Sequence, residues 1–351
     1  MKALVLTKYR HLEISEVPTP VPGPEEVLVR VAACGICGSD VHGYDGSSGR
    51  RIPPIVMGHE AAGTVALLGL AGTVLAEGDR VTFDSTVFCG KCSHCLRGEI
   101  NLCDHRRVLG VSCEDYRRAG AFAEYVAVPQ HIIYPLPETL SFQDAAMLEA
   151  VSVALHAVSL SNIAAGQTAL VLGAGMIGLL TMQALRVAGC SRVFVSDVDA
   201  TRLEFATSLG AEALLATGAD LVSQISEFTN GKGVDVAVEA VGVDETIRAA
   251  IDCVGKGGTV TLLGNISPEV TLPLQKVVTR QIRLQGSCAS AGEYPRAIEL
   301  VSSGTIQVKP LISAVAPLED GPQWFERLHS REPNLMKVIL IPGETVSAKT
   351  I

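Results

Sequence analysis

Four cysteines lie close together in the first third of the chain, at Cys89, Cys92, Cys95 and Cys103, in the spacing C-x2-C-x2-C-x7-C. Four thiolates at such short separations can surround one tetrahedral Zn²⁺ ion. A [4Fe–4S] cluster also takes four cysteines, but its usual runs differ in the last spacing. Disulfides are less expected in a chain without a secretory signal. Because four sulfur ligands leave no open coordination position, we predict a structural zinc site in the lobe 89–103.

A second set of residues, Cys37, His59 and Glu60, also has side chains that suit zinc. A thiolate, an imidazole and a carboxylate are all zinc ligands, and a set of three leaves a position for water or substrate. Taken singly, Cys37 is more typical of a small buried residue, and His59 of a core histidine with satisfied hydrogen bonds. The spacing alone does not join residues 37 and 59 into one site.

A glycine motif follows the apolar run Ala169–Leu172, in the order strand, tight turn, helix, strand and acid. This order is typical of a dinucleotide site, in which glycines allow the turn, the approach of the pyrophosphate and close helix packing. The pyrophosphate would lie at the N-terminus of the helix that begins at Met176. The residues that we expect to contact the cofactor are Gly173, Gly175, Met176, Ile177, Gly178, Asp197 and Arg202.

Asp197 follows the second strand, 192–196, where a carboxylate can accept hydrogen bonds from the adenosine ribose. An acid in this place repels a 2′-phosphate, which favours NAD over NADP. Arg202 tempers this preference, because a nearby arginine can serve a phosphate. The alternative is that Asp197 only caps the next helix.

These motifs need elements to position them. Before residue 150, short strands alternate with Gly/Pro turns, which indicates a β-barrel-like unit. A helix is expected over Ser141–Leu160, with Ser141 as its N-cap. From Thr168 onwards, strands alternate with helices, which predicts a doubly wound parallel sheet and an α/β fold class. The tail, from Val308 to Ile341, has no nucleotide motif, so we expect it to return to the first domain.

Composition narrows the function further. The 351 residues suggest two or three structural units. A net charge of −9 without a basic cluster argues against nucleic acid as a partner. Glycines and the polar Gln183 and Arg186 interrupt the most apolar run, so no membrane span is expected. The N-terminus lacks the apolar core of a signal peptide, and a cytoplasmic location is the default.

The segment Gly58–Gly63, the cysteine lobe and the glycine motif together resemble the zinc-dependent medium-chain dehydrogenase/reductase superfamily. The segments Cys37–His42 and Leu148–Ala157 are similar to its polyol dehydrogenase branch, which includes sorbitol and galactitol-1-phosphate dehydrogenases. The resemblance implies a GroES-like β-barrel catalytic domain over 1–152 and a Rossmann NAD-binding domain over 153–289. Residues 290–351 would then return to the catalytic domain. It also implies a homodimer or homotetramer.

The resemblance implies a role for each site residue. Cys37, His59, Glu60 and Glu149 match the ligands of a catalytic zinc, with Glu149 either ligating the metal or holding its water. Ser39 and His42 match the positions that pass a proton from the substrate towards solvent. The cofactors would be two Zn²⁺ ions per chain and NAD. In contrast to the sorbitol enzymes, Ala150 replaces a proline, and Gly286–Ser290 lacks their polyol-orienting arginine.

The leading prediction is a zinc-dependent oxidoreductase that transfers a hydride between NAD and a secondary hydroxyl. The substrate would be a polyol, a sugar acid or a sugar-alcohol phosphate. A threonine-type or simple secondary-alcohol dehydrogenase is the alternative among enzymes. A non-catalytic NAD-binding redox sensor, which would keep only the structural zinc, is the alternative from another class.

Overall fold

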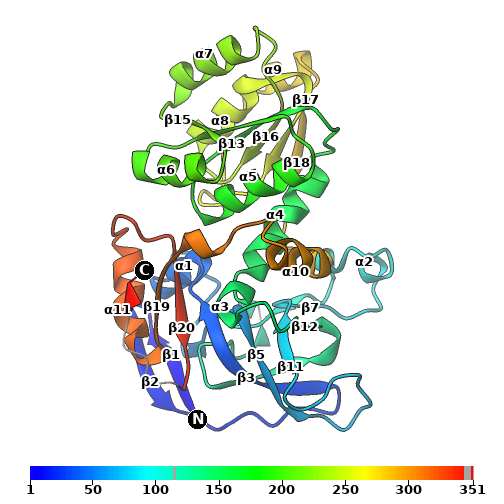
Figure 1. Cartoon of the computed structure of the whole chain (residues 1–351), viewed down its shortest axis with the longest axis vertical. Helices are drawn as coiled ribbons and strands as arrows, with labels where there is room; N and C mark the ends of the chain where they lie inside the picture. Colours follow the sequence, from blue (N-terminus) through cyan, green and yellow to red (C-terminus); the bar gives the residue numbers. More distant parts are fainter. Residues whose placement is uncertain (114–115, 344–348, 351) are drawn as a thin grey trace. The chain divides into compact units, whose positions relative to one another are not determined.

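The computed structural model describes residues 1–113, 116–343 and 349–350. Contacts within the chain divide it into two compact units. The first unit comprises Met1–Glu149, Tyr294–Gly304 and Val308–Ile351, and the second comprises Ala150–Glu293 and Thr305–Gln307. Both ends of the chain therefore belong to the same unit, as the blue and red segments of Figure 1 show. The predicted boundaries, after residues 152 and 289, stay a prediction.

The main sheet of the first unit has the strand order β12-β6-β5-β3-β20-β19-β21, and β11 also pairs with β3. Its strands are β3 Glu26–Gly35, β5 Glu60–Leu68, β6 Arg80–Phe83, β11 Tyr125–Pro129, β12 Ile133–Pro135, β19 Ile312–Pro317, β20 Lys337–Ile341 and β21 Lys349–Thr350. The side chains of β20 are all buried, and this strand runs antiparallel to β3. The C-terminal tail thus returns to the first unit.

Smaller elements complete the first unit. A three-stranded sheet has the order β2-β1-β4, and two-stranded ladders join β7 to β8 and β9 to β10. These strands are β1 Lys2–Lys8, β2 His11–Glu16, β4 Ile55–Val56, β7 Thr86–Val87, β8 Arg107–Val108, β9 Ser112–Cys113 and β10 Tyr116–Arg117. The helices are α1 Gly38–Tyr44, α2 Ser93–Leu96, α3 Phe142–Ala145, α10 Tyr294–Ser302 and α11 Gly321–His329. Phe83, Phe122 and Phe325 lie fully buried in the shared core.

The second unit is a six-stranded sheet of the order β15-β14-β13-β16-β17-β18, and every pairing in it is parallel. The strands are β13 Thr168–Leu172, β14 Arg192–Ser196, β15 Glu212–Leu214, β16 Val234–Glu239, β17 Val254–Leu262 and β18 Arg283–Gly286. The helices are α5 Met176–Val187, α6 Ala200–Ser208, α7 Gly218–Phe228, α8 Asp244–Cys253 and α9 Leu274–Thr279. Helices cover both faces of the sheet (Figure 1). This is the predicted doubly wound α/β arrangement.

The strand order reverses between β13 and β16, because the chain first builds outwards to β15 and then returns to the other side of β13. In open parallel sheets a ligand binds at the carboxyl ends of the strands beside such a reversal. The glycine motif begins directly after β13. The topology therefore places it where a dinucleotide is expected.

The helix expected over Ser141–Leu160 is divided into α3 and α4, the latter spanning Leu148–Leu160. Ser141 does cap α3, since its side chain accepts from the backbone of Asp144. The amides of Ala146 and Met147 then donate back to carbonyls at 142 and 144, which ends the first helix. The restart puts Glu149 in the first turn of α4. No helix of the described chain is both long and apolar enough to cross a membrane.

Candidate active site and cofactor turn

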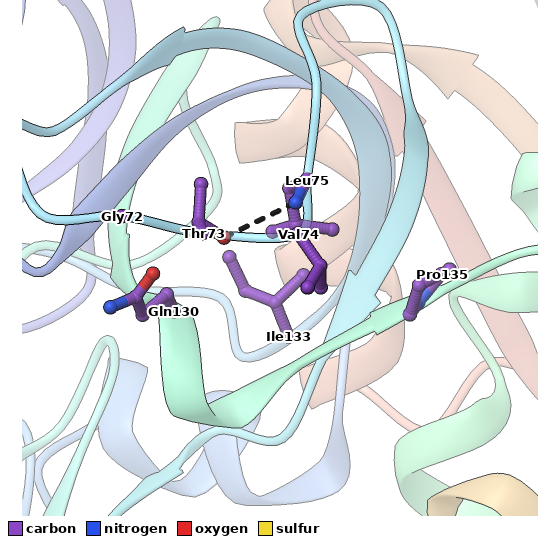
Figure 2. A pocket seen from close by; sticks show the side chains of 7 residues that line it. All are labelled: Gly72, Thr73, Val74, Leu75, Gln130, Ile133 and Pro135. Carbon is purple, nitrogen blue, oxygen red and sulfur yellow. Dashed lines mark hydrogen bonds between the residues drawn. The ribbon is translucent and has the colours of Figure 1, made fainter.

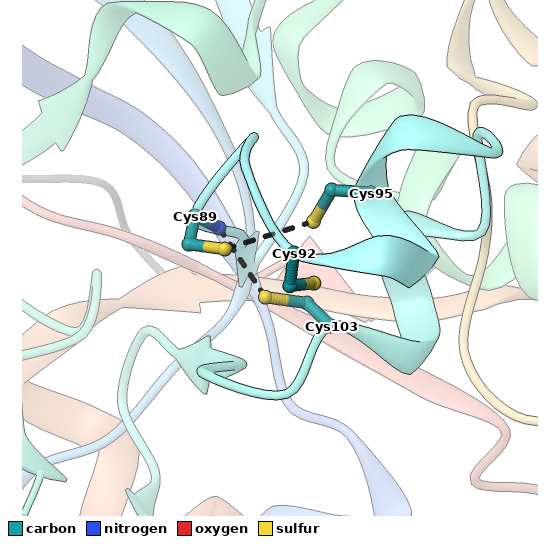
Figure 3. Close-up of side chains that lie close together, drawn as sticks. All are labelled: Cys89, Cys92, Cys95 and Cys103. Atoms are coloured by element: carbon teal, nitrogen blue, oxygen red, sulfur yellow. Dashed lines mark hydrogen bonds between the residues drawn. The ribbon is translucent and has the colours of Figure 1, made fainter.

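The four cysteines of the lobe converge on one point, as predicted. Their sulfur atoms all lie within 4.8 Å of one another, and Figure 3 shows the side chains turned inwards. The Sγ atoms of Cys89 and Cys95 are 4.0 Å apart. The backbone amides of Cys89 and His105 both approach the Sγ of Cys103 at 3.3 Å.

Backbone amides also favour the ionised form of two of these thiols, whereas burial and the neighbouring Cys92 raise the pKa of Cys95 to about 12. The N–H of Lys91 lowers the pKa of Cys89 to about 6, and the N–H of Cys95 lowers the pKa of Cys92. Thiolate is the form that binds metal. Four convergent sulfurs, two of them biased towards the thiolate, fit a closed tetrahedral zinc site.

The second set of ligands comes together because of strand register. Strands β3 and β5 are antiparallel, with Gly35 opposite Glu60. The end of β3 therefore meets the start of β5, and the next residues beyond these ends include Cys37 and His59. The ligand atoms of Cys37, His59 and Glu60 all lie within 4.8 Å of one another. A sulfur, a nitrogen and a carboxylate oxygen at this separation fit a zinc ion with an open position.

The side chain of Cys37 has a second task, as the N-cap of helix α1. Its Sγ accepts from the amide of Ser39 at 3.5 Å, and its own amide donates to the Oδ2 of Asp40 at 3.3 Å. The helix N-terminus places positive partial charge near the sulfur.

His59 lies between two side chains of the same helix. Its Nδ1 is 3.3 Å from the Oδ1 of Asp40, and its Nε2 is 3.4 Å from the Oγ of Ser39. Burial lowers the pKa of His59, but Asp40 and Cys37 together raise it well above its ordinary value. For Asp40, burial acts to raise the pKa, but His59 and Arg51 hold it well below its usual range. Asp40 and Cys37 thus favour the protonated imidazole, so a metal that binds His59 would displace a proton.

Glu60 is held by Lys337, which the sequence analysis did not single out. The Nζ of Lys337 lies 2.5 Å from the Oε2 of Glu60 and 3.2 Å from the carbonyl oxygen of Ile36. Both charged side chains are buried. Burial acts to lower the pKa of Lys337, but Glu60 and Cys37 raise it above its usual value, so the lysine stays charged. Nothing local could reveal this pair, because Lys337 begins an otherwise apolar strand.

Glu149 is not in the group of ligand atoms within 4.8 Å. It interacts electrostatically with that group, however. Burial, together with the charges of Glu60 and Asp84, raises the pKa of Glu149 to about 7, against the opposing effect of His59. The structure therefore associates Glu149 with the zinc site without making it a ligand.

The two residues expected to move a proton are both on α1. The Oγ of Ser39 contacts His59, whereas His42 is exposed and its Nδ1 is 3.5 Å from the Oγ of Ser47. Among the described residues no hydrogen bond joins Ser39 directly to His42. The path between them stays a prediction.

The three glycines of the dinucleotide motif differ in their surroundings. Gly173 has a φ of +98°, which favours glycine. A Cβ on Gly178 would lie 1.8 Å from the carbonyl oxygen of Gly173, whereas a Cβ on Gly175 would meet nothing within 4 Å. The first glycine thus makes the turn, the third allows close packing, and the second leaves open space. Gly175 is also the N-cap of α5, without a side-chain cap, and this fits a bound pyrophosphate.

Met176 and Ile177 form the first turn of α5. Both carboxylate oxygens of Asp197 accept backbone hydrogen bonds, from Ala174 at 2.6 Å and from Asp199 at 2.9 Å. The helix cap is Asp199, so Asp197 does not serve as that cap. Arg202 lies 3.7 Å from Asp199 in an exposed ion pair.

A separate hollow of about 590 Å³ lies on the first unit (Figure 2). Its lining includes Val74, Leu75, Ile133 and Pro135, and none of the lining residues is titratable. The amide of Leu75 donates to the Oγ1 of Thr73 at 3.2 Å. This hollow has no groups for acid–base or metal chemistry.

Two family models match the chain. Residues 23–138 match the alcohol dehydrogenase GroES-like domain, and residues 176–303 match the zinc-binding dehydrogenase family. Sorbitol dehydrogenase of Bacillus subtilis (strain 168) is 33% identical over 348 residues, which cover 98% of each chain. D-xylulose reductase A of Aspergillus niger is 35% identical over 338 residues and 93% of each chain.

A solved structure supports the same family assignment. A zinc-binding dehydrogenase from Sinorhizobium meliloti 1021, crystallised with NADP, superposes with a TM-score of 0.86. It is 35% identical in sequence, and the match covers 97% of this chain and 99% of that one. The likeness therefore extends over both units and includes the catalytic and nucleotide-binding parts. The chain belongs to the zinc-dependent medium-chain dehydrogenase/reductase superfamily, in its polyol dehydrogenase branch.

Proposed function

We infer that the protein transfers a hydride between NAD and a secondary hydroxyl of a polyol, a sugar acid or a sugar-alcohol phosphate. The observation that carries this inference is the incomplete set of ligands at Cys37, His59 and Glu60. A structural zinc needs four protein ligands, whereas a catalytic zinc keeps one position open. The relatives named for sorbitol and xylulose support a polyhydroxylated substrate.

We propose two zinc ions per chain, one in the cysteine lobe and one held by Cys37, His59 and Glu60. When bound, the catalytic zinc supplies a Lewis acid for the substrate oxygen, and the nicotinamide supplies the hydride acceptor. Ser39 accepts the proton of the substrate hydroxyl at Oγ. His42, exposed on the same helix, passes the proton to solvent. Glu149, with its raised pKa, holds water or replaces Glu60.

The preference for NAD rests on Asp197. The carboxylate is held across the turn by two backbone amides, so it cannot readily turn away from a ribose. A fixed negative charge there disfavours a 2′-phosphate. Because one relative was crystallised with NADP, the two cofactors are compared directly. We expect kcat/KM with NAD to exceed that with NADP, and Asp197→Ser to narrow the difference.

A threonine-type or simple secondary-alcohol dehydrogenase is the second candidate. It is favoured by the segment Gly286–Ser290, which contains no arginine to orient a polyol. A non-catalytic redox sensor would not need the site of three ligands, so the geometry argues against it.

The test is NAD reduction with polyols, polyol phosphates, sugar acids, threonine and secondary alcohols, each with and without a chelator. Zinc content is measured on the same preparation, and Leu96→Ala, an exposed change remote from the ligands, is the control. Two zincs and a chelator-sensitive rate with a polyol or its acid or phosphate would support the proposal. Activity only with threonine would favour the second candidate. One zinc without activity on any alcohol would contradict both.

The assembly and location stay proposals. We propose a homodimer or homotetramer, because the resemblance to the superfamily implies such assemblies. We propose a cytoplasmic location, as expected from the sequence. Light scattering of the purified protein would give the mass of the assembly, and a monomer would contradict the proposal.

A further inference from the structure

Arg51 is a buried arginine next to the site of three ligands. Its side chain is 4% exposed. One nitrogen, Nη2, lies 3.0 Å from the Oγ of Ser39 and 3.0 Å from the Oδ1 of Asp40. The two partners are adjacent on helix α1. They are also the two side chains that contact the two ring nitrogens of His59.

The fold makes room for this arginine. Helix α1 has Gly43 where the arginine stem passes, and a Cβ there would lie 2.2 Å from the Cγ of Arg51 and 2.9 Å from its Cβ. These atoms are near the backbone, so they cannot move aside easily. The absence of a side chain at residue 43 therefore lets Arg51 lie against the helix. The arrangement is a built site rather than a surface arginine that happens to fold back.

The hydrogen bonds restrict what each partner can do. A serine hydroxyl has two acceptor positions and one hydrogen. Because Arg51 donates to Ser39, one acceptor position and one hydrogen remain, which suffices to receive a proton on one side and release one on the other. The bond to Asp40 holds a carboxylate beside the Nδ1 of His59. Nε2 is then the nitrogen that a metal would bind, in place of its 3.4 Å contact with the Oγ of Ser39.

We propose that Arg51 is a positioning residue that holds Ser39 and Asp40 in the geometry needed for proton transfer and for zinc binding by His59. The proposal rests on the dehydrogenase function given above. One guanidinium thus fixes the positions of Ser39 and Asp40, the two side chains that contact the histidine ring. Arg51 touches neither zinc nor substrate in this role.

An anchor for a substrate phosphate is the competing role. The geometry disfavours it, because the charge of Arg51 is already paired with Asp40, whose carboxylate is fully buried. The carboxylate already balances the charge of the guanidinium, and a side chain that is 4% exposed offers little surface to a second anion. The two roles predict different kinetics: a positioning residue affects metal binding and kcat, whereas a phosphate anchor affects KM for phosphorylated substrates alone.

The experiment uses the full-length protein with Arg51→Met, Arg51→Lys and Gly43→Ala, and with Arg50→Met as the matched control. Arg50 is the neighbouring arginine and its side chain is exposed. The first readout does not depend on activity: Co²⁺ replaces zinc, and the visible spectrum and the rate of metal loss to a chelator report on the catalytic site. The second readout is kcat and KM with the best substrate of the panel.

We expect Arg51→Met to weaken metal binding at the catalytic site by about 10- to 100-fold, as outer contacts of metal ligands do. The cobalt spectrum should shift, and kcat should fall with little change in KM. Gly43→Ala should cause the same changes to a smaller degree, because it displaces the arginine without removing it. Arg51→Lys should recover metal binding better than kcat, since one ammonium group pairs with Asp40 but lacks the planar fork of a guanidinium. Arg50→Met should match wild type.

Wild-type metal affinity, spectrum and kcat in both Arg51→Met and Gly43→Ala would overturn the proposal. A rise in KM for phosphorylated substrates alone would also overturn it, in favour of the phosphate anchor. If Arg51→Met does not fold, Arg51→Lys and Gly43→Ala carry the test. If the wild type proves inactive on the whole panel, the proposed function fails, while the cobalt readout still tests the link between Arg51 and the metal.

Discussion

The cysteine lobe should depend on zinc more than any other part of the chain, and Cys89→Ser tests this dependence. The lobe contains almost no buried apolar surface. Helix α2 has no buried residue, and its Leu96 is 76% exposed. Leu102 is 47% exposed. Without metal, little remains in the lobe to offset the conformational entropy of its residues.

The size of the effect follows from the number of ligands. A structural zinc contributes roughly 12 kcal/mol to folding, so one of four thiolates carries about 3 kcal/mol. Loss of that amount raises the fraction of molecules with an open lobe by a factor on the order of 100. The remainder of the first unit should stay folded, because its core lies in the sheets and not in the lobe.

Limited proteolysis measures this opening, since Lys91 and Arg97 are exposed trypsin sites within the lobe. Cleavage follows the equilibrium open fraction when opening and closing are fast. Cys89→Ser should be cut in the lobe about 100-fold faster than wild type. Leu96→Ala should be cut at the wild-type rate. Equal cleavage of Cys89→Ser and wild type, with unchanged zinc content, would refute the structural assignment.

Three further predictions concern the second unit and the metals. Gly178→Ala should destabilise the protein by about 1–3 kcal/mol or more, seen as a lower Tm, because its Cβ would overlap the carbonyl of Gly173. The matched change Gly175→Ala should fold normally and weaken NAD binding in a titration, and equal Tm values for the two variants would contradict this contrast. Glu293→Gln should lose about 1 kcal/mol at neutral pH. Burial acts to raise the pKa of Glu293, but the hydrogen bond from His156 holds it below the usual 4.5. The stabilisation is therefore present above pH 4.5 and is lost as the pH falls through the lower folded pKa. Urea titrations measure the free energy of unfolding, and a difference between wild type and variant that persists at low pH would contradict this prediction. Removal of both metals with a chelator should abolish alcohol oxidation while NAD still binds, as measured by calorimetric titration. Loss of NAD binding after chelation would contradict the assignment of separate metal and cofactor sites.

Three features of this protein follow from local patterns in the sequence. The four cysteines converge because they lie within 15 residues, so the short chain between them limits how far apart they can be. The predicted parallel sheet is confirmed. It could be predicted because an alternation of strands and helices permits few topologies. The glycine motif has the surroundings of a dinucleotide turn, and this too is a local property, since strand, turn and helix are adjacent in sequence.

Only the tertiary structure joined the remaining groups. Cys37 meets His59 and Glu60 through the register of β3 with β5, and a register is not written in the spacing of the residues that it joins. The pairing of Glu60 with Lys337 spans 277 residues and depends on the return of β20 to the first unit. The sequence could show which residues are able to bind metal or carry charge. Which of them meet is decided by long-range strand pairing, because it brings together side chains that have no local reason to be neighbours.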